Sequence, residues 1–94
     1  MDLFAREKEL REQFETNQVQ FLLIEVDTGM TFCDVAKTSA NPEKVKRNIA
    51  NARTAYDTLL KFLDRAHFDA ASKSAFDQKF ARLQSLLRDL GQQI

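Results

Sequence analysis

The stretch AFDQKFARLQSLLRDLGQQI, residues 75–94, decides the fold class of this chain. Its large apolar residues recur in steps of four and three, at Phe76, Phe80, Leu83, Leu87, Leu90 and Ile94. Such steps place side chains on one face of an α-helix, whereas a half-buried strand alternates at every second residue. Charged and amide residues fill most positions between them, as expected of a face in water. With Asp69 as N-cap, the pattern predicts a helix over residues 69–92.

The preceding segment predicts a second helix, over residues 42–66. It begins at Asn41-Pro42-Glu43, where Asn can cap free amides, Pro suits the first helical position and Glu suits the positive end of the helix dipole. Its apolar stripe contains Val45, Ile49, Ala52, Tyr56, Leu59, Leu63 and Ala66. Because only two or three residues separate this helix from the next, we expect the two to form an antiparallel hairpin.

The first segment predicts a long helix over residues 3–37. Leu3, Leu10, Phe14, Phe21 and Ile24 follow a heptad-like spacing, which Glu7 and Asn17 interrupt with polar groups. From residue 19 onward a second apolar stripe runs beside the first, so this part needs two neighbours. Gly29 leaves open whether the helix continues, kinks or ends there. A β-hairpin around residues 27–29 is the alternative; we favour the helix, because the three-and-four spacing persists through Gly29 and no third strand is visible.

These segments predict an all-α fold, a three-helix bundle in which the long first helix packs on the two-helix hairpin. The 94 residues form one helical domain, residues 1–94, and 44% hydrophobic content is enough for a core. When the helix lengths are compared at 1.5 Å per residue, the first helix extends past the hairpin by about nine residues. We therefore expect a twofold homodimer, with Leu3, Phe4, Leu10 and Phe14 as interface candidates. The alternative is that Gly29 breaks the helix and both pieces cover one bundle.

The charges are balanced overall and unevenly distributed along the chain. Fourteen Lys and Arg residues match fourteen Asp and Glu residues, but residues 1–34 hold three bases and eight acids, a net charge of −5, which leaves +5 for residues 35–94. Either the two parts pack on each other or the difference belongs to an ordinary solvated surface. The basic residues Lys44, Lys46, Arg47 and Arg53 gather in the second helix. They are the basis of an alternative function, a nucleic-acid-associated regulator.

Catalytic chemistry has little support in the sequence. His67, between Asp64 and Asp69 at the expected end of the second helix, could serve as a base or metal ligand, but no second histidine or Cys/His cluster accompanies it. Cys33 lies on an apolar stripe, where a thiol usually acts as a small hydrophobe. We therefore expect neither an enzyme nor a metal or cofactor. The predicted function is self-association or binding to another protein, with nucleic acid less favoured.

The predicted location is the cytoplasm. The first residues carry charges and no long apolar run, unlike a secretory signal, and the longest apolar run, residues 21–24, is too short for a bilayer. Cys33 has no second cysteine to pair with in this sequence, which suits a reducing compartment. We expect no association with a membrane.

Overall fold

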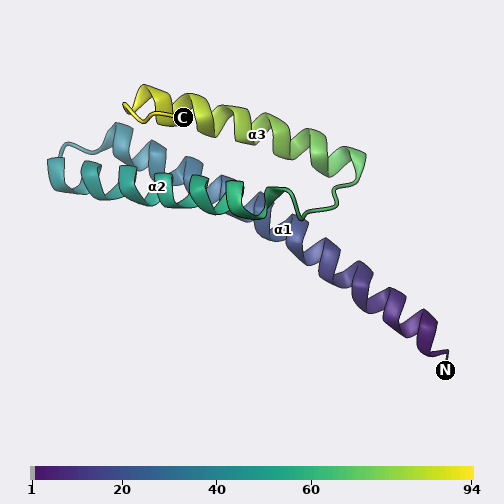
Figure 1. Ribbon diagram of the computed structural model, residues 1–94. Helices are drawn as coiled ribbons and strands as arrows, with labels where there is room; N and C mark the ends of the chain where they lie inside the picture. Colours follow the sequence, from purple (N-terminus) through teal and green to yellow (C-terminus); the bar gives the residue numbers. More distant parts are fainter. Residues whose placement is uncertain (1) are drawn as a thin grey trace.

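The computed structural model describes residues 2–94 as three α-helices (Figure 1). They are α1 (Leu3–Thr38), α2 (Pro42–Leu63) and α3 (Ala70–Asp89). No strand occurs in residues 2–94, so the all-α prediction is confirmed and the β-hairpin alternative is wrong. Met1, the first residue of the predicted domain, lies outside the described residues.

Each helix begins at a side chain that accepts hydrogen bonds from free backbone amides. Asn41 Oδ1 accepts from the amides of Glu43 and Lys44 at 3.0 and 3.3 Å. Asp69 Oδ1 accepts from the Ser72 amide at 2.7 Å, and Asp2 caps α1. The predicted caps of α2 and α3 are therefore confirmed. The amides that a helix start leaves without partners explain why these residue types stand there.

The two later helices end earlier than the sequence predicts. Helix α2 stops at Leu63 instead of Ala66. After Leu63 the amides of Arg65 and Ala66 donate to the carbonyls three residues earlier, those of Phe62 and Leu63, and not to the carbonyls four residues earlier as in an α-helix. The connecting loop brings Phe68 against Phe76, with ring centroids 5.1 Å apart. Helix α3 ends at Asp89 instead of residue 92.

The end of α3 is a left-handed turn at a glycine. Gly91 has a φ of 86°, and the Gln92 amide donates to the Leu87 carbonyl at 2.9 Å. This bond and the one from the Gly91 amide to the Arg88 carbonyl form a Schellman motif, which favours glycine because the conformation is strained for other residues. The chain therefore leaves the helix three residues before the predicted end.

Helix α1 is continuous through Gly29, so the alternative in which Gly29 breaks the helix into two pieces is wrong. Gly29 is buried, and a Cβ on it would lie 3.1 Å from Leu83 Cδ2 and 3.3 Å from Ala55 Cβ. The glycine thus gives α1 room to lie close to both neighbours. The cost of glycine in a helix interior, about 1 kcal/mol relative to alanine, is offset by this packing.

Helix α1 is the central helix of the bundle. It packs against both α2 and α3, while the backbones of α2 and α3 approach each other at fewer places than either approaches α1. Large side chains fill the space between α2 and α3: the Tyr56 ring stacks on Phe80 at 5.5 Å, and Phe80 stacks on Phe76 at 5.4 Å. Helices α2 and α3 thus follow each other in the chain as the predicted hairpin, and α1 packs against both of them.

The core occupies only the carboxyl-terminal half of α1. Its most deeply buried side chains are Leu22, Val26, Cys33, Leu59, Phe76, Leu83 and Leu87. The first buried residue of α1 is Val19, and the helix before it projects away from the three-helix body (Figure 1). The 36 residues of α1 span ~54 Å at 1.5 Å per residue, which accounts for most of the 59 Å length of the molecule.

Ion pairs contribute little to the packing of the helices. Within residues 2–94 only two join different helices: Lys79 with Asp27 at 3.0 Å, and Lys37 with Asp89 at 3.4 Å. Both pairs are partly exposed, and such pairs are worth about 0–1 kcal/mol. Only the first joins the acidic part of the chain to the basic part. The uneven charge distribution is therefore mainly a property of the surface.

Candidate functional site

The candidate site is the projecting part of α1, residues 3–18, in which no residue is buried. Leu3 is 78% exposed, Leu10 58% and Phe14 62%, and Phe4 is more exposed still. All four interface candidates are therefore exposed in the single chain. The projecting part is longer than the expected nine residues, because α2 ends at Leu63 and the chain turns back into α3.

The exposed apolar residues form one continuous line along α1. We call this line the α1 seam: Leu3, Leu10, Phe14, Phe21 and Ile24. At 100° per residue these five positions lie within about 80° of the helix circumference. Each of them is at least 44% exposed. Phe4 lies about 100° further round the helix, so it flanks the seam.

The seam meets the end of α2 in an open groove of about 290 Å³. The groove is lined by Phe14, Asn17, Gln18, Phe21, Leu22 and Phe62. Phe62 of α2 closes one end, where its ring meets Phe21 edge-on at 6.2 Å. Asn17 is exposed here. On this side of α1, α2 reaches as far as Phe21, and the seam residues from Phe14 to Leu3 have no neighbour in α2.

Sequence reasoning missed Phe62 and Gln18 as members of this groove. Phe21 and Ile24 belong to the heptad pattern but were not among the predicted interface residues, although both are exposed. The signal for those two was their place in the same heptad-like spacing as Leu3, Leu10 and Phe14. No signal in the sequence identifies Phe62, because its role depends on where α2 ends beside α1.

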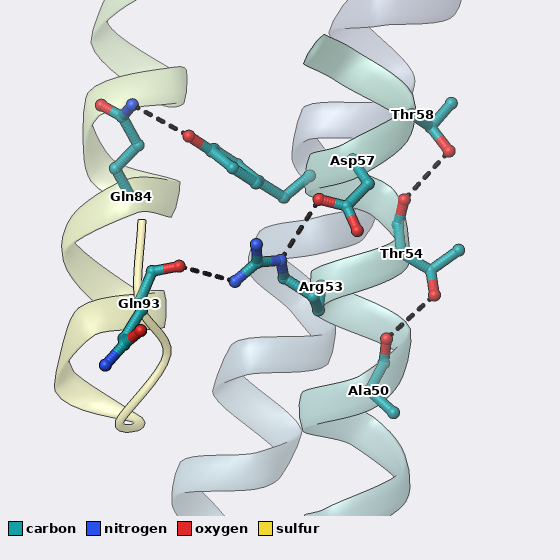
Figure 2. Close-up of polar contacts among 8 residues, drawn as sticks. Ala50, Arg53, Thr54, Asp57, Thr58, Gln84 and Gln93 are labelled. Carbon is teal, nitrogen blue, oxygen red and sulfur yellow. Dashed lines mark hydrogen bonds and ion pairs between the residues drawn. The ribbon is translucent and has the colours of Figure 1, made fainter. Parts of the chain in front are cut away.

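The basic patch is divided between two environments. Lys44, Lys46 and Arg47 are exposed near the start of α2. Arg53 donates to Asp57 Oδ1 at 3.2 Å and to the Gln93 carbonyl at 2.7 Å, as Figure 2 shows. Its guanidinium also lies 5.8 Å from the centre of the Tyr56 ring. Arg53 is therefore part of the contact between α2 and the chain end, separate from the three exposed bases.

The residues considered for catalysis lie in unrelated environments. His67 is exposed in the loop after α2, not in its last turn, and shares a shallow pocket with Glu12, Glu15 and Asp69. Cys33 is fully buried in the core, and burial, with the nearby Asp34 carboxylate, raises the pKa of its thiol. A nucleophilic cysteine needs the opposite shift. Across residues 2–94 no three His, Cys, Asp or Glu side chains are placed to hold a metal ion.

Comparisons with known proteins identify no relative of this chain. The chain matches no protein-family model, no curated protein and no solved structure. None of the three helices that residues 2–94 form is long and apolar enough to cross a bilayer.

Proposed function

We propose that this chain is a non-catalytic helical protein that acts by associating with another protein surface, its own or that of a different chain, through the α1 seam. The observation that carries this proposal is the line of exposed apolar side chains on a helix that projects beyond its own core. Fully burying a side chain such as Leu or Phe contributes about 1.5–3 kcal/mol. Burying several such side chains on one face therefore makes association strongly favourable.

The projecting helix also has little of its own to stabilise it. Isolated helices of about this length are marginal in water, because most helical stability comes from packing of an apolar face. The two ion pairs along it, Arg11 with Glu7 at 3.2 Å and Lys8 with Glu12 at 4.0 Å, are exposed. Pairs of this kind contribute roughly 0.3–0.5 kcal/mol each. A partner helix in the seam would bury apolar surface and hold this segment helical.

The proposed compartment is the cytoplasm. The support is the state of Cys33, a free thiol buried in the core. Reducing compartments maintain free thiols, whereas secreted domains of this size commonly rely on disulfides.

The test compares two variants that add the same charge to the same helix. Phe14→Glu places a carboxylate in the seam, and Thr16→Glu places one on the opposite, exposed face. Association is measured by sedimentation of the pure protein and by capture of partners from extracts of the cells that produce it. We expect Phe14→Glu to abolish association and Thr16→Glu to retain it, with similar helix content by circular dichroism.

Two results contradict the proposal. One is association of Phe14→Glu as strong as that of the unsubstituted protein. The other is the absence of any association, with itself or with another protein, by the unsubstituted chain.

A further inference from the structure

We propose that the partner of the α1 seam is the same segment of a second copy of this chain, lying antiparallel across a twofold axis near residue 12. This inference rests on the proposed function and names its partner. It follows from three independent features of the projecting helix: the order of its polar and apolar seam positions, the place where α2 ends, and the area that the seam exposes.

The seam positions fall into the two core positions of a heptad repeat. Counting from Glu7, the first core position holds Glu7, Phe14 and Phe21, and the second holds Leu3, Leu10, Asn17 and Ile24. In a pair of packed helices these positions interlock, and polar residues among them determine register and orientation. Glu7 and Asn17 are therefore the residues that decide how two copies align.

One antiparallel register matches each seam residue from Leu3 to Phe21 with a suitable partner; Ile24 lies beyond the end of the second copy's helix. When residue numbers that face each other add up to 24, Phe21 faces Leu3 of the second copy and Phe14 faces Leu10 of the second copy. The two polar residues, Glu7 and Asn17 of the second copy, then also face each other and can form a hydrogen bond. A shift of one heptad in either direction instead sets Glu7 against Leu10 or Ile24, which buries a carboxylate beside an apolar side chain.

A parallel arrangement is disfavoured by the same residues. It would place each Glu7 opposite the other Glu7, and like charges across an interface are unfavourable. It would also bring the two three-helix bodies together at one end, where Phe62 already packs on Phe21. In the antiparallel arrangement the bodies lie at opposite ends. The Arg11 side chains of the two copies lie beside each other at the twofold axis, and each is paired with Glu7 of its own helix at 3.2 Å, which offsets the repulsion between them.

The end of α2 fits the length of the incoming helix. In this register the second copy reaches Phe21 with its Leu3, close to where its helix begins. That is the place where Phe62 closes the groove and α2 starts to cover α1. Because α2 runs antiparallel to α1, the incoming helix runs in the same direction as α2 and begins where α2 ends. The projecting segment is thus long enough to cover the seam from Leu3 to Phe21, and it leaves Ile24, which is 65% exposed, outside the contact.

The exposed apolar area is sufficient for a stable dimer. With about 200 Å² for a fully buried aromatic side chain, the exposed parts of Phe4, Phe14 and Phe21 amount to roughly 350–400 Å² per chain. Phe4 counts because in this register it lies beside Gln18 of the second copy. Leu3 and Leu10 add to this area. A standard interface buries about 800 Å² per partner, slightly more than half of it apolar.

Cross-linking of introduced cysteines tests the orientation, in the full chain carrying Cys33→Ala. In the proposed register Arg6 lies beside Gln20 of the second copy, while the two Arg6 residues are ~18 Å apart along the helices. We expect a short bis-maleimide to join a mixture of Arg6→Cys and Gln20→Cys chains and neither chain alone. Cross-linking of Arg6→Cys with itself would show a parallel pair and overturn the proposal. Gln13→Cys, which lies beside the axis, is the positive control.

A charge exchange tests the register. Asn17→Asp sets a second carboxylate against Glu7 of the other copy and should weaken the dimer about tenfold or more. Adding Glu7→Lys should restore it, because the ammonium group introduced at position 7 then faces the carboxylate introduced at position 17 of the other copy. Dimerisation that Asn17→Asp leaves unchanged, or that Glu7→Lys fails to restore, would contradict this register.

Sedimentation equilibrium at micromolar to about 100 µM protein distinguishes failure of this inference from failure of the proposed function. The expected result is the mass of two chains, lost in Phe14→Glu and kept in Thr16→Glu. The mass of one chain throughout overturns the dimer. If a different protein is then still captured in a Phe14-dependent manner, the proposed function stands without self-association; if nothing is captured, both fail.

Discussion

Gly29 of α1 faces Ala55 of α2 so closely that a Cβ on Gly29 would lie 3.3 Å from the Ala55 methyl. Leu83 of α3 approaches the same glycine from the other helix, at 3.1 Å from that Cβ position. One residue without a side chain thus lets α1 contact both partners at the same level. Close packing at this point holds the long helix to the body.

Enlarging Gly29 should therefore destabilise the bundle. Gly29→Val forces a Cβ and two methyl groups into the contact with Ala55 and Leu83, and overpacking of this kind costs about 1–3 kcal/mol. Thr31→Val, at an exposed position two residues later, makes a similar side chain without crowding and should change stability by less than ~0.5 kcal/mol. Urea denaturation followed by circular dichroism measures both. Equal stabilities of the two variants would show that the close approach at Gly29 does not matter.

Two neighbouring leucines of α2 should respond very differently to the same substitution. Leu59 is fully buried and Leu60 is 48% exposed. Leu59→Ala removes buried methyl groups and leaves a cavity, at a cost of about 2–5 kcal/mol. Leu60→Ala removes a side chain that already contacts water and should cost less than ~1 kcal/mol. Thermal or urea unfolding of the pair checks this, and the reverse order would mean that α2 is rotated about its axis.

The thiol of Cys33 should be nearly inert in the native protein. It is fully buried, and burial raises its pKa, so the reactive thiolate is scarce as well as shielded. Reaction with a chromogenic disulfide at pH 8 should be roughly a hundredfold slower in buffer than in concentrated guanidinium chloride, because it has to wait for the helices to open. Equal rates in the two solvents would place Cys33 at the surface.

Asp69, the N-cap of α3, should make the free energy of unfolding fall at acidic pH. Hydrogen bonds from Ser72, chiefly from its backbone amide, lower the pKa of Asp69 below its ordinary value. A carboxyl whose pKa is lower in the folded state stabilises the fold fully above its unfolded value of about 3.9 and loses this contribution as the pH falls through the lowered pKa. Asp69→Asn keeps a cap without a titrating group.

Stability measured from pH 6 down to pH 2 should therefore fall more in the unsubstituted protein than in Asp69→Asn. The other carboxyl groups are common to both proteins, so the difference between the two curves reports Asp69. Parallel curves would show that the cap does not depend on the charge.

Duplex DNA should not bind the start of α2. Lys44, Lys46 and Arg47 are exposed there, but Arg53 is held by Asp57 and the Gln93 carbonyl. Three bases neutralise few phosphates, and non-specific affinity grows with the number neutralised. In fluorescence anisotropy at 50 mM salt we expect a dissociation constant weaker than roughly 100 µM. Micromolar binding that weakens steeply with salt and is lost in Lys44→Glu would favour the nucleic-acid alternative.

Most of the fold could be predicted because its signals are local. The stripe from Phe76 to Ile94 follows one helix face, and Asn41 and Asp69 cap helices through residues two or three positions away. Helix ends were predicted less well. The end of α2 depends on how the chain turns after Leu63, and that turn is accompanied by a contact between the loop and the next helix, Phe68 with Phe76. A periodic pattern cannot show where such a turn begins.

The candidate site was predicted in part for the same reason. Leu3, Leu10 and Phe14 stand out by their heptad spacing, and their exposure follows from the length of the first helix. Phe62 could not be assigned, because it joins the groove only where α2 stops beside Phe21. Arg53 could not be separated from the other bases, because Gln93, forty residues away, supplies the carbonyl that engages it.

By itself the sequence determined that the chain forms three helices, which residues begin two of them and which apolar line runs along the first. These features depend on helical periodicity and on hydrogen bonds between near neighbours, which short stretches of sequence contain in full. Only the tertiary structure decided that α1 passes straight through Gly29 between α2 and α3, and how much of its seam remains uncovered. Both depend on contacts between residues far apart in the chain, Gly29 with Leu83 and Phe21 with Phe62.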